Sequence, residues 1–179
     1  MREIISGITC LLQYVNMSRE AIERCRPQHC VHCNALTPWH HGHYERKADR
    51  ENDGSDTLNP IPIYRFYCAH CRRTSSLLPE CIPPRRWYLW TVQQIGLLLM
   101  LTGQTAYTAA KQVTPTGRTL TRWLLALKKR HLEFQADLKS WRSRLGYYPE
   151  FESFWQYILT VAPLSEVMCY LNAMGVIVP

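Results

Sequence analysis

Two Cys-x-x-Cys pairs constrain the fold of this chain more than any other feature: Cys30 and Cys33 in "QHCVHC", and Cys68 and Cys71 in "FYCAHC". A Cys-x-x-Cys on a tight turn presents two sulfur atoms to one cation, and two such turns supply the four tetrahedral ligands of a structural zinc site. β-Hairpins bring such turns together, so the pairs predict a small zinc ribbon with one structural zinc ion. Since thiolates would fill every ligand position, the site is expected to build structure and not to catalyse.

Other readings of the cysteine pairs need features that the sequence does not show. A redox pair requires a thioredoxin-like βαβ context, which is missing. His29, His32 and His70 lie beside the pairs and could contribute ligands, but each pair already supplies two thiolates, so exposed turn positions are expected for them. The histidines of "HHGHY" at 40–44 are expected to lie exposed on a hairpin turn and not to form a second metal cluster.

The segments around the pairs predict an α+β fold that is mostly α. A single amphipathic helix is expected over 3–24, within an N-terminal segment 1–26. The ribbon is expected over 27–83, with a β-strand in "IPIYRFYC" at 61–68 and a mobile polar loop at 46–60.

Helical patterns follow from Pro84 onward. One helix is expected from Pro84 to Gly103, a short one at 104–112, and a long one at 118–145 that can be broken. Two more are expected at 150–161 and 164–173. These elements predict a helical domain at 84–145 and C-terminal helices within 146–179.

The apolar stretch at 87–101 contains two adjacent glutamines and is shorter than the ~20 residues that a membrane span needs. It is therefore predicted to be a buried helix, and no membrane partner is expected. The start of the chain does not resemble a signal peptide, so a cytoplasmic, nucleoid-associated protein is expected.

Charge is concentrated in the middle of the chain. The formal net charge is −1 over residues 1–60, +11 over 61–145 and −3 over 146–179. A polyanion such as nucleic acid is the natural partner of such a block, although a solvated basic surface has the same composition.

The stretch "AAKQVTPTGRTLTRWL" at 109–124 has the pattern of a helix-turn-helix. Ala110 is the expected small contact between the helices, and Thr116 can cap the second helix. Four apolar residues are expected to anchor that second helix: Val113, Leu120, Trp123 and Leu124. Thr114 precedes Pro115 where a glycine is common, so a wider turn is expected. An ordinary helical hairpin with a basic face remains the alternative.

The outward positions of that second helix are the predicted DNA contacts. They are Thr116, Gly117, Arg118, Thr121 and Arg122, followed by a basic cluster of Lys128, Lys129 and Arg130 suited to phosphates. Arg72 and Arg73, beside the second cysteine pair, could stabilise the thiolate charge or contact phosphate.

The order of these motifs resembles the zinc-ribbon plus helix-turn-helix segment of insertion-sequence transposases and of transposase-associated accessory DNA-binding proteins. The resemblance covers about residues 27–130, through "HGHYERK", "YRFYCAHCRRT" and "RTLTRWL". It implies binding to double-stranded DNA in an accessory or regulatory role. It does not imply strand transfer, because those transposases use three carboxylates on a separate domain, and about 55 residues after the motif cannot hold such a domain.

Two other function classes compete with DNA binding. A protein-interaction adaptor could dock a transposase or integrase through the ribbon and the aromatic stretch "FESFWQYILTV" at 151–161, although that stretch has the pattern of a helix core. An enzyme is not expected, because the sequence shows no nucleophile–base pair and no phosphate-binding loop. The oligomeric state, including a homodimer, is left open.

Overall fold

The chain divides into two compact units, Met1–Trp87 and Tyr88–Pro179. The structure is a computed structural model and describes residues 2–17, 19–47, 60–84 and 88–178. It mixes α-helices with a β-sheet and brings four cysteines together, as the sequence predicts. Most of the loop expected to be mobile at 46–60 lies outside the described residues.

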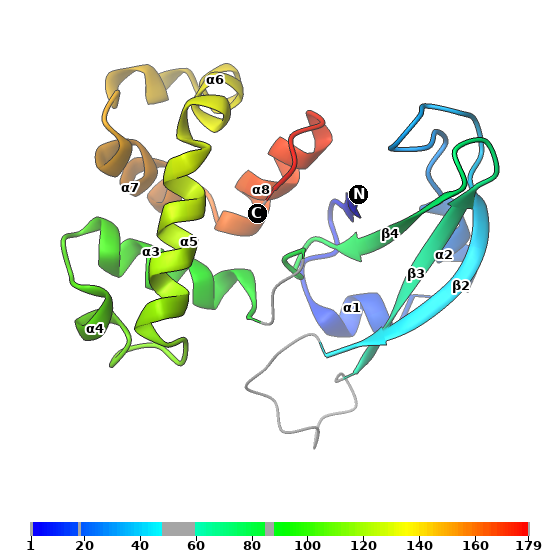
Figure 1. Cartoon of the computed structure of the whole chain (residues 1–179), viewed down its shortest axis with the longest axis horizontal. Helices are drawn as coiled ribbons and strands as arrows, with labels where there is room; N and C mark the ends of the chain where they lie inside the picture. Colours follow the sequence, from blue (N-terminus) through cyan, green and yellow to red (C-terminus); the bar gives the residue numbers. More distant parts are fainter. Residues whose placement is uncertain (1, 18, 48–59, 85–87, 179) are drawn as a thin grey trace. The chain divides into compact units, whose positions relative to one another are not determined.

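The sheet belongs to the first unit. In the described part of that unit it has four strands in the order β1-β4-β3-β2 (Figure 1). The bounds are Arg2–Ile5 for β1, Trp39–Arg46 for β2, Ile61–Cys68 for β3 and Arg73–Pro79 for β4. The pairs β2–β3 and β3–β4 are antiparallel, whereas β1 runs parallel to β4. The strand predicted at 61–68 is confirmed as β3.

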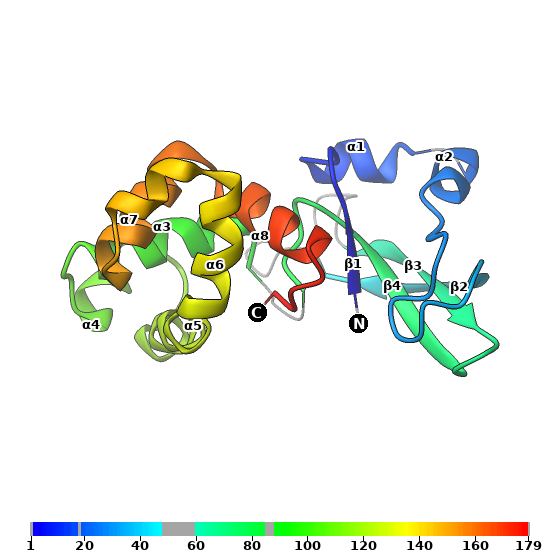
Figure 2. The ribbon, with the colours of Figure 1, turned by 90° about the horizontal axis from the view of Figure 1, so that it is seen from above.

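The single helix expected over 3–24 is wrong. The segment forms β1 and two short helices, α1 at Leu11–Val15 and α2 at Arg19–Arg24, which lie on one side of the sheet in Figure 2. Gly7 has φ +81°, a left-handed conformation that ends any continuous helix, and its N–H donates to the carboxylate of Glu80 over 2.9 Å.

Of the apolar residues that suggested this helix, Ile8 is buried and Ile5 and Leu11 pack around it, whereas Leu12 and Val15 are exposed. Ile8 and Tyr14 belong to the core of the first unit. They form one core cluster with residues of β3, β4 and the segment after β4: Ile8, Tyr14, Ile61, Ile63, Leu78 and Ile82. The Tyr14 hydroxyl donates to the Pro62 carbonyl over 2.8 Å. Packing against a distant strand therefore overrides the local helical periodicity.

The second unit is helical. Its elements are α3 (Trp90–Leu101), α4 (Ala106–Ala109), α5 (Gly117–Lys129), α6 (His131–Trp141), the 3₁₀ helix η1 (Ser143–Tyr147), α7 (Phe151–Val161) and α8 (Leu164–Ala173). The helices expected at 150–161 and 164–173 are confirmed as α7 and α8. The long helix expected at 118–145 is broken at Arg130, where φ is −110°. Fully buried rings of Phe134, Phe154 and Trp155 form the centre of this unit.

The helix α3 begins six residues later than the expected start at Pro84. Leu89 before it is extended, and the buried Gln93 side chain donates to the Tyr88 carbonyl over 3.0 Å, which holds this extended entry. The helix buries Trp90, Leu97 and Leu101. Among the residues that the structure describes, no helix combines the length and the apolar character that crossing a membrane requires.

The second glutamine of α3 joins three helices. The Gln94 side chain donates to the Leu159 carbonyl in α7 over 3.1 Å and accepts from the Leu164 N–H at the start of α8 over 2.7 Å. These backbone groups lie at a helix end and at a helix start, where no intrahelical partner is available to them.

Gln94→Met is expected to destabilise the second unit by about 2 kcal/mol, because it keeps the side-chain volume but leaves two half-buried backbone groups without this partner. Chemical denaturation followed by circular dichroism measures the change. Gln112→Met is the matched control: Gln112 is exposed, its side chain donates to that of Gln104 over 2.8 Å, and stability should change by less than about 0.5 kcal/mol. Equal losses in the two variants would contradict the bridging role of Gln94.

Candidate metal centre and basic helical face

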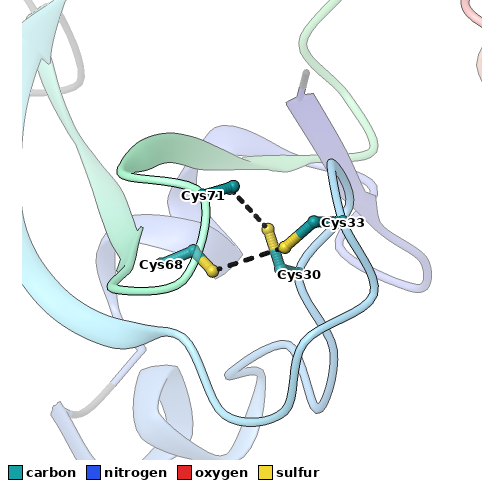
Figure 3. A group of neighbouring side chains, drawn as sticks. All are labelled: Cys30, Cys33, Cys68 and Cys71. Atoms are coloured by element: carbon teal, nitrogen blue, oxygen red, sulfur yellow. Dashed lines mark hydrogen bonds between the residues drawn. The ribbon is translucent and has the colours of Figure 1, made fainter.

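Four cysteine sulfur atoms meet where the two turns of the first unit approach each other (Figure 3). The Sγ atoms of Cys30 and Cys71 are 3.6 Å apart, as are those of Cys33 and Cys68, and all four lie within 4.8 Å of one another. A tetrahedral zinc site with Zn–S bonds of about 2.3 Å has sulfur–sulfur edges of about 3.8 Å. The four predicted ligands are therefore close together and compatible with one structural metal ion.

The two turns share one backbone geometry. The residue after each pair is left-handed, with φ +59° at Asn34 and +57° at Arg72. In the first turn, the Cys30 N–H donates to the Ala35 carbonyl over 2.7 Å, and the Asn34 N–H donates to the Cys30 carbonyl over 2.8 Å. Asparagine tolerates this conformation better than most residues, whereas Arg72 adopts it without that advantage.

Backbone N–H groups of the turns point at the sulfur atoms. His32 N–H donates to Cys30 Sγ over 3.4 Å. Cys33 accepts from Ala35, Cys68 accepts from Cys71 and His70, and Cys71 accepts from Arg73, all through backbone N–H groups. Donors directed at sulfur stabilise thiolates, which are the forms that bind metal.

The same arrangement separates the pKa values of Cys68 and Cys33. The Cys71 N–H lowers the pKa of Cys68 to about 6. At Cys33 the Ala35 N–H lowers the pKa, but burial and the neighbouring thiols outweigh it and raise the pKa to about 12. Several thiolates at this separation repel one another, and a divalent cation removes that repulsion. The donor set thus fits a thiolate-bound cation.

The histidines near the pairs are not part of this cluster. His29 and His70 are exposed, and His32 Nε2 lies 3.4 Å from the Thr74 carbonyl oxygen. In the part of the chain that the structure describes, the cysteines form the one group with metal-binding geometry. The histidines of "HHGHY" are exposed as expected, but the predicted turn is wrong: they lie in β2, which has a bulge between His40 and His43 and φ +70° at Gly42.

The second candidate site is a face of α5. Leu120, Trp123 and Leu127 of this helix are buried. The opposite side carries six exposed residues, here called the basic stripe: Arg118, Thr121, Arg122, Leu125, Lys128 and Lys129. Four of the six carry a positive charge, and α5 contains no acidic residue. In the described residues, Arg118, Arg122 and Lys129 have no carboxylate within ion-pair distance.

Several of the residues predicted to contact DNA also have contacts within the protein, among them Thr116, Gly117 and Arg130. Thr116 is the N-cap residue of α5, as expected, but its hydroxyl lies 3.1 Å from that of Thr119 and accepts no helix N–H. A Cβ added to Gly117 would lie 3.0 Å from the Ala106 carbonyl oxygen, so α4 and α5 approach closely there. Arg130 Nε donates to the carboxylate of Glu133 over 2.8 Å, which pairs its charge at the start of α6.

The remaining predicted positions lie as follows. Arg72 is exposed on the turn between β3 and β4, and Arg73 is exposed at the first position of β4. Of the expected anchoring residues, Leu120 and Trp123 are buried, whereas Val113 and Leu124 are half-buried. Ala110, the expected small contact, is half-buried, whereas its neighbour Ala109 in α4 is fully buried.

A family model described as "Domain of unknown function (DUF6431)" matches residues 30–123, which is more than half of the chain. No curated protein and no solved structure matches the chain. The region that the family model matches contains both cysteine pairs and α3, α4 and the first half of α5.

Proposed function

Since the chain belongs to the DUF6431 family, which is defined as a domain of unknown function, we propose a function from its own residues: zinc-dependent binding of double-stranded DNA. In this proposal the basic stripe of α5 contacts DNA, and the four cysteines hold one structural zinc ion. The stripe is the observation that carries the proposal.

The dimensions and chemistry of the stripe suit a DNA groove. From Arg118 to Lys129 the helix rises about 16 Å, at 1.5 Å per residue, and the major groove of B-DNA is about 12 Å wide. Arginine and threonine at the N-terminal half can read base edges, while Lys128 and Lys129 at the other end suit phosphates. In helix-turn-helix proteins the N-terminal residues of the recognition helix likewise contact bases.

The helices before α5 support a helix-turn-helix, with one departure. α3 and α4 both pack against α5, and the approach of Ala106 to Gly117 supplies the close contact that the motif needs. However, α4 is a single turn, and the connection to α5 runs from Ala110 to Thr116. The Thr114–Pro115 step in that connection favours extended backbone, which agrees with the wider turn that the sequence predicts.

The identity of the metal as zinc rests on the ligand chemistry. Four thiolates in tetrahedral spacing are the ligand set of structural zinc sites, and such a site has no open position for water. The proposed task of the ion is to hold β3, β4 and the turn at Cys30–Cys33 together.

An accessory or regulatory role at a mobile element, without strand transfer, rests on the sequence resemblance and not on the fold. A transposase or integrase is the partner which that resemblance suggests. The aromatic stretch at 151–161 does not support the adaptor alternative. Its residues Phe151, Phe154 and Trp155 belong to α7 and are buried, so their side chains are not exposed to a partner.

Binding to a 20-base-pair duplex across a salt series tests the proposal. A stripe that neutralises four phosphates gives a log K against log [salt] slope of about −3.6. Fluorescence anisotropy between 50 and 300 mM salt is the measurement, with the zinc-loaded full chain. Absence of binding, or an affinity that does not respond to salt, would rule the proposal out.

A further inference from the structure

The first unit has a surface that neither the metal site nor the basic stripe uses. On β2 and β3, His43 contacts Tyr64, Tyr64 contacts His40, and His40 contacts Phe66, with ring centroids 5.9, 6.0 and 5.9 Å apart. We call these four residues the ring array. Both histidines are exposed, Tyr64 is half-buried and packs against the core cluster of the first unit, and Phe66 is 1% exposed.

The array lies at an edge of the sheet. β2 has β3 as its only sheet neighbour among the described strands. The bulge between His40 and His43 brings both side chains to the ring of the same residue, Tyr64. The rings therefore form a continuous run across the two strands, and the two histidine rings are exposed to solvent.

The segments that form the cysteine turns and strands β2 to β4 contain more basic than acidic side chains. Residues 28–47 and 60–79 contain five basic side chains, Arg46, Lys47, Arg65, Arg72 and Arg73, and one acidic side chain, Glu45. Glu45 lies 3.5 Å from His43 Nε2, and both side chains are about half exposed. These two segments thus have a formal net charge of +4, which suits a phosphate backbone. The whole of 27–83 has no net charge, because residues 48–59 contain four acidic residues and one arginine and Glu80 follows β4.

We propose that the ring array binds unpaired nucleobases, so that the ribbon is a binding site for single-stranded nucleic acid. Proteins that bind single strands combine a basic surface with rings on which successive bases stack, and histidine is one of the side chains used. The proposal goes beyond the duplex contact of α5 and involves residues of the other unit.

The chemistry of the array distinguishes unpaired from paired bases. In a duplex the faces of the bases are stacked on one another, and only their edges are open in the grooves. An exposed ring can stack on a base only when that base is unstacked from its neighbours. The array is therefore expected to favour single strands over duplex of the same length.

The test measures anisotropy of labelled 20-nucleotide oligothymidine and oligouridine with the zinc-loaded full chain. Either strand should bind, and comparison of the two distinguishes a DNA from an RNA partner. The double variant His40→Ala/His43→Ala should weaken this binding at least about fivefold, because removal of a single base–ring stack already has that effect. Duplex binding and zinc content should not change.

The matched control is His29→Ala/His70→Ala, which removes two exposed histidines of the same unit outside the array. It should keep the affinity of the unaltered protein for the single strand. Tyr64→Leu, which removes a ring but keeps an apolar side chain, gives an independent readout and should also weaken binding while zinc is retained. Failure of both oligonucleotides to bind, or equal losses in the array and control variants, would overturn the proposal. Loss of duplex binding alone would refute the role of α5 and leave this inference standing.

Discussion

Cys30→Ser is expected to lower the zinc content from about one ion per chain to nearly none and to unfold the ribbon. Cys30 is 4% exposed, and its sulfur lies 3.6 Å from that of Cys71. Structural zinc contributes about 10–16 kcal/mol of apparent binding free energy in small zinc domains, which equals or exceeds the roughly 5–15 kcal/mol by which whole domains are stable. Metal analysis and limited proteolysis of residues 28–79 measure the two effects.

Cys10→Ser is the matched control for this variant. Cys10 is exposed, lies outside the cluster and caps α1 by accepting the Gln13 N–H over 3.4 Å. Serine fills that capping position well, so neither zinc content nor protease resistance should change. A strong chelator should reproduce the Cys30→Ser result in the unaltered protein. A folded Cys30→Ser protein that retains one zinc ion would show that the ligand assignment is wrong.

The cluster of four cysteines could be predicted from the sequence because the geometry of each pair is local. The two residues between the cysteines of each pair determine the turn. The number of residues that separate the two pairs along the chain does not affect the geometry of the cluster. The buried and exposed faces of α5 could also be predicted, because the 3.6-residue period of a helix places Leu120, Trp123 and Leu127 on one side. The ion pair of Arg130 with Glu133 was missed, although a pair three residues apart in a helix is a visible signal.

The failures involve partners that are distant in sequence. Residues 2–5 pair with 76–79 in β1 and β4, so no local pattern could show that they form a strand. The start of α3 depends on the Gln93 side chain folding back to Tyr88. The ring array depends on the register of β2 against β3, and a bulge shifts that register at Gly42. A shift of one residue moves every side chain to the other face, so the sequence of β2 alone could not place His40 and His43 together.

A second large effect is expected for Arg118→Ala/Arg122→Ala. These arginines are exposed at the N-terminal half of α5, and neither has an acidic partner among the described residues. Removing an arginine that binds a base edge costs about 1–3 kcal/mol, so duplex affinity should fall by at least about 30-fold for the two together. The salt slope should also become shallower, by up to about 1.8, which is the change expected if each arginine also neutralises one phosphate. Zinc content should be unchanged, since the variant leaves the cysteine cluster intact.

Arg142→Ala/Arg144→Ala separates a specific α5 interface from general attraction of a basic protein to DNA. Like Arg118→Ala/Arg122→Ala, it removes two positive charges from the second unit, but both residues lie outside the basic stripe. Arg142 also lies 3.6 Å from the carboxylate of Glu166. If α5 is the interface, this variant should change duplex affinity less than about threefold and leave the slope nearly unaltered, because only phosphates bound by the protein release their counterions. If both double variants lose the same affinity and the same slope, net charge alone attracts the DNA and α5 is not its binding face. Anisotropy titrations of the two variants at identical salt concentrations decide between these outcomes.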